Sequence, residues 1–176
     1  ASLFPQLTSS NLMEFASSSS SFPKSKSRWR YDVFINCSGE KDLRKNFVSH
    51  LYYALSKAGV YTVLDHQGTE LGKLMQLERS QIAIVVFSKS YTESTLCLDE
   101  LEKIIEIHET YGQRLVVVFY EIDPSHVRDQ KGDFGKALKV TAQKSFLEEH
   151  LESGLSRWSQ ALTKAANFSG LDLKNC

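Results

Sequence analysis

Apolar residues in this chain follow two patterns that alternate along the sequence. Two runs, at 82–87 and 115–120, contain almost no polar residue. Continuous apolar runs of this length are typical of parallel strands that are covered on both faces. Elsewhere apolar residues recur every three or four positions, which indicates helices that bury one side. The alternation predicts an α/β fold, a parallel sheet of four to five strands with helices on both faces.

The elements can be placed one after another from Tyr31 onward. A first strand is expected at 33–35, and Asp42 is expected to cap a helix that ends at Gly59. Pro124 bars a strand at the turn that follows the second apolar run. The remaining predictions are a strand at 60–65, a loop at 66–72, a short helical segment at 73–79, a helix at 97–110, short helical pieces between 132 and 150, a helix that ends near 169–170, and an edge strand at 171–173.

One carboxylate does not fit the pattern of the helix predicted at 97–110. On a helical wheel Glu100 falls on the flank of the apolar stripe, within the first turn. A carboxylate beside apolar neighbours is costly unless it is used, so Glu100 is a candidate functional residue. The stripe that it borders consists of Cys97, Leu98, Leu101, Ile104 and Ile105.

Length, charge and cysteine content narrow the class of protein. The 176 residues suffice for one domain with a core, and 21 basic and 21 acidic side chains leave a formal net charge of zero. No overall field favours nucleic acid or an anionic membrane, and no apolar run reaches the length of a membrane span. Three cysteines without metal-ligand spacing predict free thiols and no metal site. We therefore expect an intracellular, soluble protein without strong nucleic-acid binding.

The N-terminal part differs in composition from the rest. Residues 1–30 carry serine clusters and then a basic run, and they predict a disordered Ser-rich tail ahead of a domain at 31–176. A Ser-rich lead with few acidic residues is also compatible with an organelle transit peptide.

Several segments, in order, resemble the plant-type Toll/interleukin-1 receptor (TIR) domain. They are YDVFINCSGE from Tyr31, IAIVVFSKSYTES from Ile82, CLDEL from Cys97, VVVFYEIDPSHVRDQKGDFGKAL from Val116 and RWSQALTKAANFSG from Arg157. The resemblance implies a flavodoxin-like fold, a role in plant innate immunity in the cytoplasm or the nucleus, and hydrolysis of NAD+ as a substrate, with no bound cofactor.

The same resemblance assigns roles to individual positions. The catalytic glutamate of the family's CLxEL motif falls on Glu100. Gly39 matches the glycine of the first loop, and the loop from Asp65 to Gly72 matches a loop beside the nucleotide. Cys97 heads the catalytic helix, where it either contacts substrate or packs as a small apolar residue.

A second group of residues points to self-association with other TIR domains. Ser49 and His50 match a serine-histidine pair that plant members use for this purpose. Tyr53 shares the outer face of the same predicted helix, and a merely solvated surface is the alternative interpretation.

Three departures from the family pattern leave a second function open. Ser38 replaces an arginine that could meet the substrate's phosphates, and Leu96 replaces a tryptophan. The second crossover helix is also expected to be shortened by roughly two turns. The alternative to an NAD+ hydrolase is therefore a catalytically weak interaction module that joins or dampens other TIR assemblies.

Overall fold

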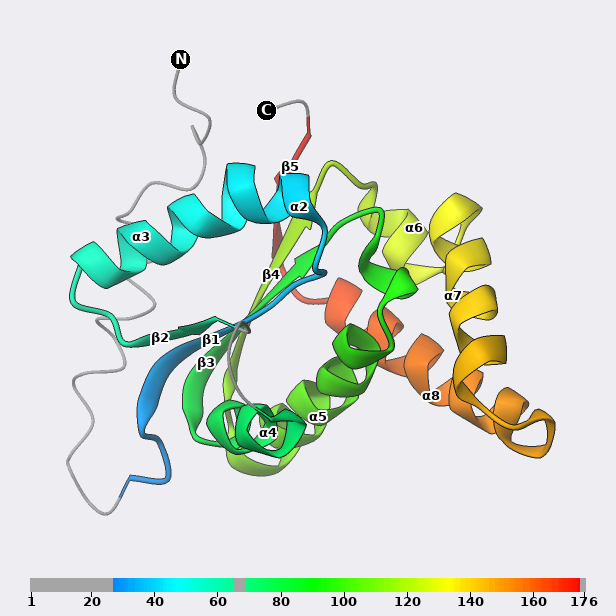
Figure 1. Cartoon of the computed structure of the whole chain (residues 1–176), viewed down its shortest axis with the longest axis horizontal. Coiled ribbons are helices and arrows are strands. Elements are labelled where there is room, and N and C mark those ends of the chain that lie inside the picture. Colours follow the sequence, from blue (N-terminus) through cyan, green and yellow to red (C-terminus); the bar gives the residue numbers. More distant parts are fainter. Residues whose placement is uncertain (1–26, 65–68, 175–176) are drawn as a thin grey trace.

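The computed structural model describes residues 27–64 and 69–174, and a sheet of five parallel strands forms their centre (Figure 1). The order is β2-β1-β3-β4-β5, so the apolar run predicted at 82–87 is the central strand and the predicted fifth strand lies at the edge. This arrangement confirms the predicted fold class. The strands are β1 (Tyr31–Asn36), β2 (Thr62–Leu64), β3 (Ser80–Phe87), β4 (Arg114–Tyr120) and β5 (Gly170–Leu173).

Helices cover both faces of the sheet because neighbouring strand residues point to opposite sides. Val33 and Ile35 contact one helical layer, whereas Phe34 contacts the other. The first layer consists of α2 (Lys41–Leu43), η1 (Arg44–Val48) and α3 (Ser49–Lys57). The second consists of α4 (Glu70–Glu78), α5 (Thr95–Tyr111), α6 (Pro124–Arg128), α7 (Gly132–Ser145) and α8 (Glu148–Ala166).

The first helical segment is continuous but changes its hydrogen-bond pattern in the middle. Between α2 and α3, η1 is a π-helix, and the Ser49 hydroxyl donates to the carbonyl oxygen of Arg44 at 2.5 Å. The prediction that Asp42 caps this helix is wrong, because Glu40 occupies the N-cap and Asp42 lies inside the first turn. The predicted end is confirmed: α3 stops before Gly59, which adopts a φ of +80°.

The second crossover helix, α4, has nine residues. Its start differs from the prediction, since Thr69 is the N-cap and accepts a hydrogen bond from the amide of Gly72 at 3.2 Å. Gly72 therefore lies in the first turn of a helix and not in a loop. The Thr69 hydroxyl stabilises this earlier start, because it accepts from a first-turn amide that has no partner within the helix. Asp65 lies outside the described residues.

The segment after β4 is more regular than its sequence suggests. Asp123 caps α6 by accepting from the amide of Ser125 at 2.8 Å, and Pro124 takes the first helical position. The expectation of short helical pieces between 132 and 150 is wrong, since α7 and α8 are long helices that meet at 146–147. The charges that suggested interruptions lie on outer faces, while Phe134, Leu138 and Ala142 keep helical spacing toward the core.

The chain contacts the domain before β1 begins. The amide of Arg30 donates to the carbonyl of Arg79 at 2.7 Å, and the Arg28 guanidinium lies 3.5 Å from the ring centre of Tyr111. The rest of the predicted disordered tail, residues 1–26, lies outside the described residues.

Candidate functional site

Glu100 is buried where α5 crosses the end of β1. Its side chain is only 3% exposed, and its Oε2 accepts a hydrogen bond from the Asn36 amide nitrogen at 2.8 Å. Helix α5 is fixed at this point because the Ser94 hydroxyl accepts from the amide of Cys97 at 3.2 Å. The residue that departed from the helical pattern in sequence is thus an interior carboxylate.

Tyr91 determines how the Asn36 amide is oriented. The Tyr91 hydroxyl donates to the Asn36 side-chain oxygen and lies 3.1 Å from the carbonyl of Cys97. With its oxygen held in this way, Asn36 must turn its NH₂ group toward Glu100. Burial, followed by the nearby Cys97 thiol and Glu100 carboxylate, raises the pKa of Tyr91 well above its usual range. The hydroxyl therefore stays protonated and remains a donor.

Cys97 completes this group, which we call the buried site: Asn36, Tyr91, Cys97 and Glu100. Cys97 is 3% exposed, and its thiol donates to the backbone oxygen of Cys37 at 3.1 Å, which joins α5 to the residue that follows β1. The Cys37 side chain packs into the opposite helical layer. This geometry is that of a small packing residue, one of the two roles considered for Cys97.

A separate cavity opens at the carboxyl ends of β1, β3 and β4. It has a volume of about 950 Å³, and Gly39, Ser90, Glu93 and His126 are among its lining residues. We call it the carboxyl-edge cavity. Of the predicted substrate-binding residues it includes Gly39, whereas Gly72, Cys97 and Glu100 do not line it. The structure therefore brings Glu100 and Cys97 together but places Gly39 in a different space.

Gly39, which matches the glycine of the family's first loop, is not among the glycines with positive φ. A Cβ atom at this position would meet nothing within 4 Å. A glycine is therefore not required here by the local backbone.

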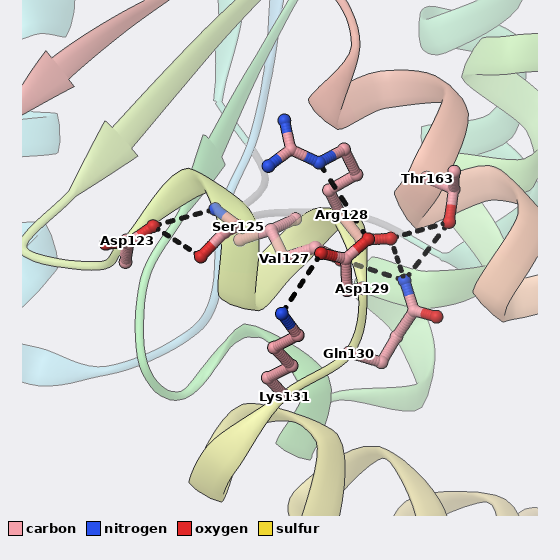
Figure 2. Close-up of polar contacts among 8 residues, drawn as sticks. All are labelled: Asp123, Ser125, Val127, Arg128, Asp129, Gln130, Lys131 and Thr163. Atoms are coloured by element: carbon pink, nitrogen blue, oxygen red, sulfur yellow. Dashed lines mark hydrogen bonds and ion pairs between the residues drawn. The ribbon is translucent and has the colours of Figure 1, made fainter.

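One wall of the cavity is held by the network drawn in Figure 2. The Gln130 amide donates to the backbone oxygens of Val127 at 2.9 Å and Arg128 at 2.8 Å, and Thr163 of α8 donates to the latter oxygen at 2.7 Å. Gln130 itself has a φ of +50°, which is unusual for a side chain of this kind. Side-chain bonds thus fix the chain between α6 and α7, and with it His126 and Gly132 in the cavity wall.

Ser38, at the position of the family's arginine, points toward the loop after β3. Its side chain is buried, and its hydroxyl lies 2.7 Å from that of Ser90 and 3.4 Å from that of Ser88. A different guanidinium contacts the loop after β1, because Arg44 Nε donates to the backbone oxygen of Ser38 at 3.2 Å.

The residues predicted for self-association lie together on the exposed side of α3. Tyr53 is 65% exposed, and Ser49 and His50 are exposed as well. The bond from Ser49 back to Arg44 occupies its hydroxyl within its own helix. His50 and Tyr53 thus present the larger contact groups on this face.

Two members of the buried site were missed in the sequence. Asn36 lies just beyond the strand predicted at 33–35, but it is the last residue of β1 and points to the same side as Phe34. The alternation of strand side chains could have identified its direction. Tyr91 belongs to η2 (Tyr91–Glu93), a short 3₁₀ turn with no pattern of its own.

The two described ranges also bear on metal clusters and on membrane-spanning helices. No group of three His, Cys, Asp or Glu side chains there is arranged to hold a metal ion. No helix in these ranges combines the length and the apolar character needed to cross a bilayer.

Comparison with known families decides the relationship. The model of the TIR domain matches residues 30–176. The chain belongs to the TIR-domain family.

Relatives of this TIR domain are plant disease-resistance proteins. It is 45% identical over 161 residues to TMV resistance protein N of Nicotiana glutinosa, covering 88% of this chain and 13% of that protein. It is 42% identical over 163 residues to Disease resistance protein RPV1 of Vitis rotundifolia, covering 90% and 11% respectively. The chain therefore spans only a small part of the length of these relatives.

A solved structure agrees with the fold. The TIR domains of the activated Roq1 resistosome, which directly recognizes the pathogen effector XopQ, superpose with a TM-score of 0.72 at 41% identity. The match covers 83% of this chain and 89% of that chain.

Proposed function

We propose that this TIR domain hydrolyses NAD+ at the nicotinamide-ribose bond when it is assembled with other TIR domains, as part of plant innate immune signalling. One observation carries the proposal: in the two described ranges, Glu100 is the only acidic or basic residue that is buried. The relatedness to disease-resistance proteins and to the TIR domains of a resistosome supports the biological setting.

The burial of Glu100 is expensive for a residue with a purely structural task. Moving a carboxylate out of water costs several kcal/mol after relaxation of the surroundings, and hydrogen bonds offset only part of this desolvation free energy. A neutral glutamine could accept the same bond from Asn36 at lower cost. A dry carboxylate held in one orientation is instead what electrostatic catalysis requires.

The reaction uses the properties of this carboxylate directly. As the C–N bond breaks, the electron pair leaves with nicotinamide, and positive charge develops on the ribose ring as in glycoside hydrolysis. Glu100 accepts hydrogen bonds from the ribose hydroxyls and stabilises that charge. Water then adds to the ribose carbon and loses a proton. Nicotinamide departs as a neutral base, so no strong general acid is needed.

The enclosure of Glu100 gives a physical reason for dependence on assembly. At 3% exposure the carboxylate cannot touch a substrate until neighbouring groups move. Contacts between domains can supply the free energy that such an opening requires, because binding shifts a conformational equilibrium by its differential affinity for the two states.

The test is a nicotinamide-release assay at high protein concentration or on a crowding surface. Glu100→Gln keeps the shape of the side chain and should lower the rate by about a hundredfold or more. Glu106→Gln, on the exposed side of the same helix, is the matched control and should retain the rate. Wild-type protein that releases no more nicotinamide than the Glu100 variant would contradict the proposal.

A second function is favoured by Ser38, which leaves its loop without the family's arginine side chain. In this alternative the domain is a catalytically weak module that joins other TIR domains through His50 and Tyr53. It predicts that wild-type protein is inert in the assay above yet binds an active TIR domain. His50→Ala and Tyr53→Ala should then weaken that binding, and unchanged binding by both variants would exclude this face.

A further inference from the structure

The Asn36 side chain uses its nitrogen and its oxygen in different directions. It is fully buried, and its nitrogen donates to Glu100 Oε2 at 2.8 Å and lies 3.4 Å from the backbone oxygen of Cys97. Its oxygen accepts from the Tyr91 hydroxyl. A buried amide is costly unless its groups are paired, and here the pairing directs a donor at a single carboxylate.

The same amide could be accommodated with its nitrogen and oxygen exchanged. The nitrogen would then donate to the Tyr91 oxygen, and the Tyr91 hydroxyl could still donate to the backbone oxygen of Cys97, which lies 3.1 Å away. The amide oxygen would face Glu100, where it repels a carboxylate and can accept only from a protonated carboxyl group. The orientation in the structure therefore suits an ionised Glu100, and the exchanged one suits a neutral Glu100.

The titratable groups around Asn36 cannot act as a counter-ion for Glu100. Those that influence Tyr91 in the buried site are Cys97, Glu100 and Cys37. A hydroxyl or a thiol is neutral or negative but never positive, so these groups stabilise an anion only as hydrogen-bond donors. Other acids of the same elements point elsewhere, namely Asp99 and Glu102 toward α8 and Glu93 into the carboxyl-edge cavity.

We propose that Asn36 is a positioning residue for the hydrolysis: its amide, oriented by Tyr91, keeps Glu100 as an anion in one fixed orientation. This inference rests on the proposed function, in which an ionised Glu100 accepts from ribose hydroxyls and stabilises positive charge. A protonated carboxyl group would lack that charge, and a rotating carboxylate would meet the ribose in the wrong direction. Asn36 contacts Glu100 and acts through it.

A titration of Glu100 tests the charge without any measurement of catalysis. Carbon-13 NMR of protein labelled at the glutamate carboxyl carbons follows each carboxylate, and Glu100→Gln identifies the Glu100 signal. Asn36→Ala should raise the titration midpoint of Glu100 by about one pH unit, because the lost hydrogen bond favours the charged form. The exposed Asn46→Ala is the matched control and should leave the midpoint unchanged. An equal midpoint in wild type and Asn36→Ala would overturn the proposal.

Nicotinamide release, measured in the assay given for the proposed function, tests the positioning. Asn36→Ala should lower kcat by about tenfold and change KM by less than about twofold, because the substrate contacts themselves stay in place. Asn46→Ala should keep both constants. A rise in KM with kcat unchanged would overturn the proposal, since it would show that Asn36 contributes to binding and not to the state of Glu100.

Tyr91→Phe is the milder variant, and it tests whether Tyr91 acts through Asn36. It should raise the titration midpoint of Glu100 by a smaller amount than Asn36→Ala does and lower kcat by about threefold. In a chain that already carries Asn36→Ala, the same change should leave kcat as it is, because residues that act through one another are not additive. An equal loss in both backgrounds would overturn the role assigned to Tyr91.

Failure of this inference and failure of the proposed function give different results. Inert wild-type protein contradicts the hydrolysis, and the titration then still decides whether Asn36 holds Glu100 as an anion. Active wild-type protein whose Asn36→Ala variant keeps its full kcat overturns the positioning role and leaves the hydrolysis in place.

Discussion

The buried site and the carboxyl-edge cavity lie on two sides of the same short turn, η2. The carboxylate of the buried site is enclosed by protein, whereas the carboxylates of the cavity face an open space. Tyr91 of this turn faces inward and helps to orient the partner of Glu100. Ser90, Glu93 and Ser94, beside or within the turn, face the cavity. Glu100 is buried and accepts a hydrogen bond from a fixed amide. The carboxylates of the cavity lie where solvent screens their mutual repulsion.

The difference shows that a short irregular segment can separate a buried carboxylate from a cavity lined by other carboxylates. The Thr92 hydroxyl donates to the backbone oxygen of Phe134 at 2.8 Å, and the Thr141 hydroxyl donates to that of Thr92 at 2.6 Å. These buried bonds hold the turn against α7. The segment between the cavity and Glu100 is therefore fixed by hydrogen bonds as well as by apolar contacts.

The largest effect is expected from the cavity side, at Gly135. A Cβ at this position would lie 1.9 Å from the backbone oxygen of Gln130, so the chain between α6 and α7 must shift. Gly135→Ala should lower the free energy of unfolding by about 3 kcal/mol or more, measured by urea denaturation.

Gly39→Ala at the rim of the same cavity is the matched control, because a Cβ there meets nothing within 4 Å. It should change the free energy of unfolding by less than about 0.5 kcal/mol. Equal stability of the two variants would show that the cavity wall adapts and is not fixed by the Gln130 network.

A somewhat smaller effect is expected on the buried side, at Asn36. Asn36→Ala removes the amide that donates to Glu100 and leaves the carboxylate with less compensation in the interior. The free energy of unfolding should fall by about 2 to 3 kcal/mol. The exposed Asn46→Ala is the control and should cost less than about 0.5 kcal/mol. If the Asn36 variant is as stable as this control, solvent reaches the Glu100 carboxylate in the folded protein.

The smallest effect is expected from Tyr91→Phe, which changes the wall itself. It removes one hydroxyl with two acceptors and should cost about 1 to 2 kcal/mol at neutral pH. The pKa of Tyr91 is raised in the folded state, so above about pH 10 the unfolded chain ionises this group first. Unfolding then releases a proton, and stability falls as the pH rises.

The gap in stability between wild type and Tyr91→Phe should therefore narrow above about pH 10, as measured by urea denaturation across alkaline pH. A gap that stays constant over this range would mean that Tyr91 titrates alike in the folded and unfolded chains, and so is not shielded from water.

Much of the fold could be predicted because a strand that is buried on both faces appears in the sequence as a continuous apolar run. The runs that became β3 and β4, and the stripe of α5, needed no other information. Glu100 was identifiable for the same reason, since a single acid on the edge of an apolar stripe is visible on a helical wheel. The full length of α7 was not predicted although its core residues keep helical spacing, because charged residues alternate with them along the sequence.

Other features depend on contacts that no local pattern records. The π-helical bonds of η1, the capping of α4 by Thr69 and the placement of Tyr91 against Asn36 are decided by which partner each polar group meets. The separation of Gly39 from Glu100 is a property of the three-dimensional arrangement of loops. Gly39 lines the carboxyl-edge cavity, whereas Glu100 belongs to the buried site, and no local pattern in the sequence indicates this difference.

The two outer strands of the sheet carry a consequence for aggregation. β2 has three residues and β5 has four, so each outer edge offers few backbone groups to a strand from another molecule. Short edges of this kind are a common protection against uncontrolled strand-to-strand growth. The proposed assembly with other TIR domains can thus use helices and loops, while the short edge strands limit strand-to-strand growth.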